Sequence, residues 1–214
     1  MEEKSTKNVR EALKTIPGVT SSTDVRIKDG MIENISIAHN TTGSLTLQRL
    51  QVDDSEALFD FYFHGLSEKS RDYWPPYPLF SPPVESAEEL AGRIKDWQKE
   101  DDWTVLKLLK GSQIIGIGLL KRYKTEQPTS GLAVREEYQG KGLGRIIQTL
   151  INEQARLLRL KELYITLAQD NTASFKLHKE CGFTETGNLV PHYVYRNGAR
   201  EIDRQDLEMI IKFG

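Results

Sequence analysis

The chain is poor in cysteine: Cys181 is the one cysteine among 214 residues. A single thiol cannot form an intrachain disulfide framework or a cysteine-rich zinc site. Cys181 precedes Gly182 and Phe183 in an apolar context, which favours a small buried core residue over a nucleophile. We therefore expect chemistry that uses neither a thiol nucleophile nor a cysteine-bound zinc ion.

The chain also lacks a long apolar run and a strong excess of one charge. No apolar segment approaches the roughly 18–20 residues that span a bilayer, so we expect no membrane partner. The formal net charge of −2 argues against a general nucleic-acid binder. The chain begins with Met1 followed by three charged residues, Glu2, Glu3 and Lys4, and this start lacks the apolar segment of a secretory signal. These features predict a cytoplasmic protein.

What is present is an ordinary globular balance, with 38% hydrophobic and 28% charged residues. This balance allows a full hydrophobic core. The length suits one domain, or one domain with an appendage. We find no internal repeat and no low-complexity segment.

The most informative stretch is 132–145. Leu132, Ala133 and Val134 end a predicted strand, and a glycine-rich turn then leads into a predicted helix. Apolar residues recur in that helix at spacings of three, four and seven, which predicts one buried face. They are Leu143, Ile146, Ile147, Leu150, Ile151, Leu157 and Leu158.

The turn has the chemistry of an anion site. Gly140, Gly142 and Gly144 stand at alternate positions, where glycine allows positive φ and close approach of a ligand. The first amides of a helix have no internal partner and carry positive potential. A phosphate or pyrophosphate is the natural ligand, and Lys141 and Arg145 add positive charge.

Two common phosphate motifs do not fit. A P-loop requires Ser or Thr after Gly-Lys, and Gly142 follows Lys141 here. The dinucleotide fingerprint G-x-G-x-x-G is also not met, because the run is G-x-G-x-G. A magnesium-dependent nucleotide binder is therefore the weaker alternative.

The pattern Gln139-x-x-Gly142-x-Gly144 resembles the pyrophosphate loop of the GNAT superfamily of acetyltransferases. A second segment follows a predicted short strand and has the spacing of the family's N-x-x-[AS]-x-x-L-Y-x-x-x-G-F segment. Its matching residues are Asn171, Ser174, Leu177, His178, Gly182 and Phe183. One departure stands out: the family usually has tyrosine where this chain has His178.

The resemblance covers residues 44–214 and implies the GNAT acyl-CoA N-acyltransferase fold. This is an α/β fold with a twisted, mixed and mostly antiparallel sheet and helices on both faces. It also implies acetyl-coenzyme A as the acetyl donor and no metal. By the same resemblance, the cofactor-binding residues are Leu132, Ala133, Val134, Gln139, Gly140, Lys141, Gly142, Leu143, Gly144, Arg145, Asn171 and Ser174.

Residues 1–43 lie outside the resemblance and form a predicted N-terminal extension. A helix is expected over 3–16, ended by Pro17-Gly18. A polar linker over 20–23 precedes a β-hairpin whose turn is Asp29-Gly30. This unit is too small to be stable alone, so we expect it to pack on the main domain or on another subunit.

Within 44–214 the pattern predicts four helices and seven strands. Helices are expected from Asp53 or Asp54 to Tyr62, from Glu85 or Ser86 to Trp97, from 143 to about 159, and over 171–181. Strands are expected over 45–50, 103–109, 114–120, 129–135, 163–168, from 183 onward and over 207–213. Residues 64–84 are predicted to be irregular.

Acetyl transfer to an amine passes through an oxyanion, which a preorganised N–H stabilises. The family uses a backbone N–H of the strand before the glycine loop, and we favour Val134. His178 takes the place of the tyrosine that protonates the leaving thiolate. A neutral imidazole still donates one N–H, although a satisfied core histidine is the alternative, with water protonating the thiolate. Asn171 resembles the residue that contacts the pantetheine arm and is also a natural helix N-cap.

The acceptor site is less well defined. In this family it lies near residues 71–78, where Tyr73, Trp74 and Tyr77 would pack on the acceptor or simply cover the edge of the core. The general base stays unassigned among Glu126, Glu136, Glu137 and a chain of waters.

Together these residues predict an N-acetyltransferase. It would move an acetyl group from acetyl-coenzyme A to a primary amine by direct transfer in a ternary complex. The acceptor would be a small molecule, a protein N-terminus or a lysine, and a homodimer is left open. The alternative is a non-catalytic CoA-binding regulatory module, because His178 replaces the usual tyrosine.

Overall fold

The computed structural model describes residues 2–74, 83–99, 102–196 and 199–214. Its strands are β1 (Val19–Lys28), β2 (Met31–His39), β3 (Gly43–Arg49), β4 (Trp103–Lys110), β5 (Gln113–Lys121), β6 (Thr129–Val134), β7 (Glu162–Ala168), β8 (Thr184–Arg196) and β9 (Ala199–Lys212). They form one sheet in the order β1-β2-β3-β4-β5-β6-β7-β9-β8. Neighbouring strands pair antiparallel except β6 and β7, which run parallel.

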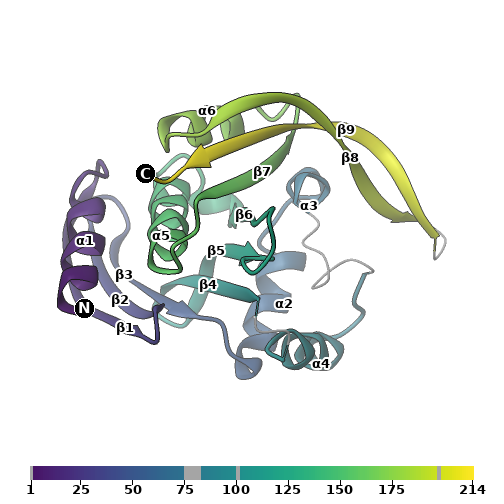
Figure 1. The fold of residues 1–214 in the computed structure, drawn as a ribbon. Helices are drawn as coiled ribbons and strands as arrows, with labels where there is room; N and C mark the ends of the chain where they lie inside the picture. The colour runs from purple at the N-terminus through teal and green to yellow at the C-terminus, as the bar shows by residue number, and fades with distance from the viewer. Residues whose placement is uncertain (1, 75–82, 100–101, 197–198) are drawn as a thin grey trace.

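Helices cover both faces of this sheet (Figure 1). They are α1 (Glu2–Lys14), α2 (Ser55–Phe63), α3 (Glu68–Tyr73), α4 (Ala87–Trp97), α5 (Leu143–Leu157) and α6 (Thr172–Glu180). One hydrophobic cluster joins α1 and α5 to the sheet, and a second joins α2 and α4 to residues of β4 and β5. The predicted α/β class, with a mixed and mostly antiparallel sheet, is confirmed.

Helix α5 is held tightly against the middle of the sheet. Leu143, Ile146, Ile147, Leu150 and Ile151 are each at most 1% exposed, as the spacing of the apolar residues predicts. Each fully buried aliphatic side chain contributes about 1.5–3 kcal/mol relative to an exposed one. This packing fixes the N-terminus of α5 beside the end of β6.

Two glycines of β5 allow that close approach. A Cβ added to Gly116 or Gly118 would lie 2.6 or 2.4 Å from side-chain carbons of Ile147. Glycine in a strand is otherwise unfavourable, and such positions mark close contact with a neighbouring element.

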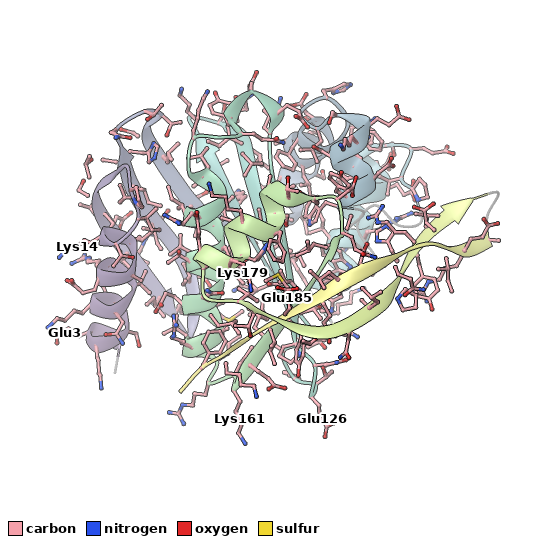
Figure 2. The ribbon with its side chains drawn as sticks, turned by 90° about the horizontal axis from the view of Figure 1, so that it is seen from above. Glu3, Lys14, Glu126, Lys161, Lys179 and Glu185 are labelled. Carbon is pink, nitrogen blue, oxygen red and sulfur yellow. The ribbon has the colours of Figure 1, made fainter. Side chains whose placement is uncertain are left out.

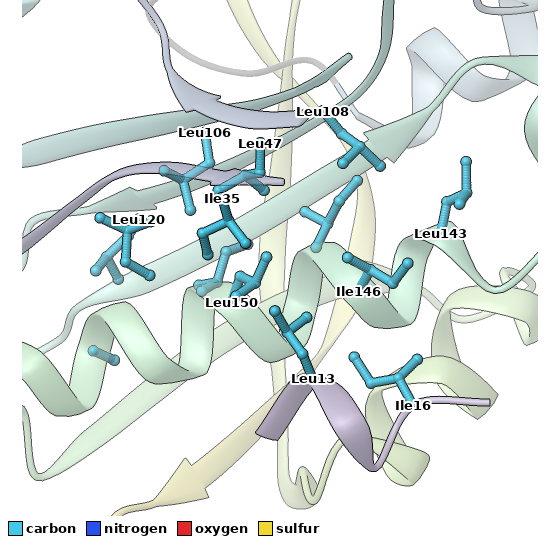
Figure 3. Close-up of a cluster of buried hydrophobic side chains, with 14 of the residues drawn as sticks. Leu13, Ile16, Ile35, Leu47, Leu106, Leu108, Leu120, Leu143, Ile146 and Leu150 are labelled. Carbon is cyan, nitrogen blue, oxygen red and sulfur yellow. The ribbon is translucent and has the colours of Figure 1, made fainter. Parts of the chain in front are cut away.

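The N-terminal extension lies in the same sheet and on the same core. β2 pairs with β3 from Asn34 to His39, so β1 and β2 continue the sheet. Figure 3 shows Leu13 of α1, and Ile16 of the turn that follows it, next to Ile146 of α5. The helix and the Asp29-Gly30 hairpin are present as predicted, whereas a boundary between domains near residue 43 stays a prediction.

Several predicted boundaries are wrong. Residues 20–23 belong to β1 rather than to a linker, and β9 begins at Ala199 rather than near 207. Helix α3 lies in the stretch predicted to be irregular, because its six mostly polar residues show no apolar periodicity. Asp54 stands at the N-cap of α2 without a capping bond. Its carboxylate instead accepts from the backbone of Gln51 and pairs with Lys107.

The ribbon of β8 and β9 extends beyond the other strands (Figure 1). Near its base, Lys179 of α6 pairs with Glu185 of β8 at 3.2 Å (Figure 2). This pair connects α6 to the ribbon. In the part of the chain that the structure describes, no helix combines the length and apolar character needed to cross a bilayer.

Candidate active site

The sheet opens between β6 and β7. In this parallel pair, Thr129 of β6 and Tyr164 of β7 are the one pair of residues in register. Beside them, the Tyr164 N–H donates a hydrogen bond of 2.9 Å to the Pro128 carbonyl. Beyond that point the strands separate, and a cavity of about 750 Å³ lies between them. Its walls come from β6, β7, α3, α6 and the glycine loop.

The opening leaves backbone groups of β6 facing the cavity. The Arg135 N–H donates to Ile115 of β5 at 2.9 Å. Since the N–H groups of successive strand residues point to opposite sides, the Val134 N–H points away from β5 toward the gap. The Val134 carbonyl, on that same side, accepts from the Gln139 side chain at 3.0 Å. Val134 thus has the orientation expected of an oxyanion donor.

The glycine loop forms one end of the cavity. Gly140 and Gly142 have φ of +71° and +81°, a backbone region that favours glycine, and Gly142 is the N-cap of α5. Gly144 has another reason to be glycine, because an added Cβ would lie 3.1 Å from Leu177 of α6. The N-terminus of α5 therefore lines the cavity, and its first amides have no partner within the helix, which fits a pyrophosphate group.

The two cations of the loop are placed differently. Arg145 lines the cavity and pairs with Glu180 of α6. Lys141 is not among the lining residues: its Nζ donates to the Glu137 carbonyl at 2.7 Å and lies 5.0 Å from the centroid of the Tyr138 ring. Gln139, Leu143 and the β6 residues Leu132 and Ala133 line the cavity with the three glycines of the loop.

The second predicted segment forms the facing wall. Asn171 caps α6, its Oδ1 accepting from the Ser174 N–H at 3.1 Å. Both residues also line the cavity. Asn171 can cap α6 and line the cavity at once, because the N-terminus of α6 lies at the gap between β6 and β7.

His178 lines the cavity yet is only 4% exposed. Its Nδ1 lies 2.8 Å from the Ser174 carbonyl, its Nε2 lies 3.3 Å from Gln148, and its ring packs edge-on against Phe183. Burial lowers the pKa of His178 to about 4, with the hydrogen bond to Ser174 acting weakly in the opposite direction. The imidazole is therefore neutral, and its Nδ1–H is used within α6. Its role toward a thiolate stays a prediction.

The other end of the cavity is lined by α3. Tyr73 and Trp74 are lining residues, while Tyr77 lies outside the described residues. Of the three candidate bases, Glu136 lines the cavity, and Glu126 and Glu137 are not among its lining residues.

Glu136 is held by two serines of the α2–α3 region. Its Oε1 accepts from the Ser67 N–H at 3.1 Å, from the Ser67 hydroxyl at 2.7 Å and from the Ser70 hydroxyl. Burial raises the pKa of Glu136, but the hydrogen bonds from Ser70 and Ser67 outweigh it and lower the pKa overall. Sequence reasoning missed these serines; the one local signal was the spacing of Ser67 and Ser70, which suits a helix cap.

Comparisons with known proteins agree with this geometry. The family model for the acetyltransferase (GNAT) domain matches residues 44–184. A spermidine N(1)-acetyltransferase of Vibrio cholerae is 26% identical over 167 residues, which is 75% of this chain and 90% of that protein. A [ribosomal protein bS18]-alanine N-acetyltransferase of Haemophilus influenzae is 28% identical over 110 residues, covering 51% and 74% of the two chains.

Solved structures show the same fold. The spermidine N-acetyltransferase from Vibrio cholerae in complex with CoA and spermine aligns with a TM-score of 0.62 and 24% identity, covering 78% of this chain and 95% of that one. The family model spans more than half of the chain and includes both the glycine loop and α6. The chain therefore belongs to the GNAT family of acetyltransferases, whose acetyl donor is acetyl-coenzyme A.

Proposed function

We propose that this protein transfers an acetyl group from acetyl-coenzyme A directly to a primary amine within a ternary complex. One observation carries the proposal. The separation of β6 from β7 turns the Val134 N–H toward the cavity, between the glycine loop at one end and Glu136 with α3 at the other. A thioester and an amine could thus meet at a fixed backbone donor.

The glycine loop and α6 would hold the cofactor. The amides at the N-terminus of α5 would bind the pyrophosphate, and Asn171 and Ser174 would contact the pantetheine arm from the facing wall. The bound cofactor supplies an activated acetyl group and a thiolate leaving group. Acetyl-coenzyme A is available in the cytoplasm, where we place the protein.

The Val134 N–H would stabilise the oxyanion that forms when the amine attacks the thioester carbon. Such a preorganised donor typically changes kcat by about 10²–10³-fold. Direct transfer is favoured because burial raises the pKa of the Cys181 thiol to about 11, which leaves it unreactive at neutral pH.

The leaving thiolate needs a proton. That proton would come from water, because a neutral imidazole does not give up its N–H to a thiolate. His178 could help by turning its Nδ1–H from the Ser174 carbonyl to hydrogen-bond the sulfur. If His178 serves in this way, His178→Ala lowers kcat more than it weakens CoA binding. If kcat is unchanged, His178 is a core residue.

Glu136 would hold the ammonium form of the acceptor at the α3 end. Because its pKa is lowered, Glu136 suits an ion pair with the amine better than removal of the proton, which would pass to water. Tyr73 and Trp74 would pack along the carbon chain of the acceptor. The names of the two relatives make spermidine and alanine N-termini the first acceptors to try.

The test measures thiol release from acetyl-coenzyme A with polyamines, amino acids, aminosugars and peptides, while calorimetry measures CoA binding. CoA binding with release on one amine class supports the proposal. CoA binding without release on any amine favours the alternative, a non-catalytic CoA-binding module.

Val134→Pro then tests the oxyanion donor, since Val134 donates no ladder bond to β5 and proline lacks the N–H. Because proline also fixes φ and replaces a buried side chain, thermal unfolding is measured beside the kinetics. We expect kcat to fall about 10²–10³-fold with CoA affinity retained. An unchanged kcat would exclude this donor.

A further inference from the structure

The last residue of β2, His39, lies against the glycine loop although it belongs to the N-terminal extension. It precedes residues 44–184, which the family model matches. A Cβ placed on Gly142 would lie 3.9 Å from His39 Nε2. His39 is 4% exposed, and within the described ranges its ring hydrogen bonds involve Nδ1 alone. The Nε2 atom therefore lies beside Gly142, the N-cap of the helix proposed to bind pyrophosphate, although His39 itself is not among the residues that line the cavity.

The contacts of Nδ1 define the tautomer. The Thr42 N–H donates to Nδ1 at 3.2 Å, and the Thr42 hydroxyl lies 2.9 Å from the same nitrogen. An Nδ1 that accepts carries no proton, so the neutral ring carries its proton on Nε2. Burial lowers the pKa of His39, which keeps the ring neutral. His39 thus presents an N–H donor on the side of Gly142.

The turn after α1 holds the ring in this position. A Cβ on Gly18 would lie 2.5 Å from Nε2, so only glycine leaves room for the imidazole there. Gly18 has φ of +92°, and its carbonyl accepts from the Asn40 N–H at 2.8 Å. The neighbouring Pro17 lines the cavity and presents its carbonyl oxygen 3.8 Å from the Gly142 Cβ position. That oxygen is an acceptor and cannot bind a phosphate, so of these two neighbours of the Gly142 Cβ position only His39 carries a donor.

We propose that His39 donates its Nε2–H to the pyrophosphate of acetyl-coenzyme A. The N-terminal extension would then supply a cofactor contact that residues 44–184 do not contain. This inference rests on the proposed function, because the pyrophosphate must occupy the glycine loop. A hydrogen bond to a charged group is stronger than one between neutral groups, so one such donor would have a measurable effect.

Two substitutions separate donation from a purely structural role. His39→Asn places an acceptor near Nδ1 for Thr42 but does not reach Gly142. His39→Gln places an N–H donor near Nε2 but removes the acceptor for Thr42. Calorimetry measures the affinity of the full-length wild type and of both variants for CoA and 3′-dephospho-CoA, and thermal unfolding monitors stability.

We expect His39→Asn to bind both cofactors about 10- to 100-fold more weakly, and His39→Gln to stay within a few-fold of wild type despite a lower unfolding temperature. The reverse result would overturn the inference: if His39→Asn binds CoA like wild type and His39→Gln binds it weakly, the role of His39 is structural. A loss confined to CoA would also overturn it, by pointing to the 3′-phosphate. A wild-type protein that binds neither cofactor would instead overturn the proposed function.

Discussion

The hydroxyl of Tyr73 donates a hydrogen bond of 2.8 Å to Oδ2 of Asp170, across the end of the active-site cavity. Tyr73 ends α3, and Asp170 stands between β7 and α6. Arg204 of β9 supports the same corner: it donates to the Asp72 carbonyl at 3.1 Å and lies 5.8 Å from the centroid of the Tyr73 ring. The α3 end of the cavity, where we propose that the acceptor binds, is therefore held by contacts between segments far apart in sequence.

Tyr73→Phe should raise the KM for the amine by about 2- to 10-fold, because one hydrogen bond contributes roughly 0.5–1.5 kcal/mol. CoA affinity should not change, since Tyr73 is remote from the glycine loop. Tyr164→Phe is the matched control: it loses a bond of 2.6 Å to Glu162 within β7, away from the cavity lining. Steady-state kinetics at varied amine concentration measure the KM of both variants. An equal change in KM for Tyr73→Phe and Tyr164→Phe would contradict the prediction.

Gly142→Val should lower CoA affinity by at least about tenfold, because its side chain would enter the space proposed for pyrophosphate. Backbone strain at positive φ should also cost about 1–2 kcal/mol of unfolding free energy. Gly111→Val controls for that strain, since Gly111 has φ of +61° in the β4–β5 turn with nothing within 4 Å of an added Cβ. Calorimetry and urea unfolding should show similar destabilisation but a binding loss only at Gly142. Unchanged CoA affinity would exclude the pyrophosphate assignment.

Glu136→Gln should raise the KM for the amine by about tenfold, because an amide keeps the hydrogen bonds from Ser67 and Ser70 but loses the charge that attracts an ammonium group. Glu137→Gln removes the same charge from an exposed neighbour outside the cavity lining and should have little effect. Kinetics at low and high salt check this prediction. If both variants raise the KM equally, the cause is the overall charge of the protein surface, and Glu136 does not bind the acceptor.

His178 should make stability fall as the solution is acidified. Burial lowers its pKa to about 4, while an unfolded histidine titrates near about 6.5. Between these values the unfolded chain binds a proton that the folded protein does not, so unfolding becomes easier as pH decreases. At about 1.36 kcal/mol per pH unit, the contribution is on the order of 3 kcal/mol.

The measurement is the difference in unfolding free energy between pH 7 and pH 4.5, by urea titration. His178→Phe should lose the His178 share of that dependence, whatever its absolute stability, because it has no group to protonate at that position. The share of other groups with lowered pKa values, such as His39, should remain. An identical pH dependence in both proteins would show that His178 is not buried in its neutral form.

Features set by short-range geometry were accessible from the sequence. The apolar spacing from Leu143 predicts the buried face of α5, the alternate glycines predict a turn at a helix N-terminus, and Asn171 predicts a cap. Each depends on residues within a few positions of one another, where backbone geometry is nearly the same in every fold. Helix α3 could not be predicted in this way, because its apolar residues do not recur at helical spacing, although it provides one wall of the cavity.

Only the tertiary structure decided how those parts meet. The burial of His178, the capture of Glu136 by Ser67 and Ser70, the bond from Tyr73 to Asp170 and the approach of His39 to Gly142 each join segments that the chain separates widely. Such contacts depend on strand order and on the place where β6 leaves β7. Local propensity carries no information about either. The glycine turn at the start of α5 could therefore be predicted from the sequence, but the residues that surround it required the fold.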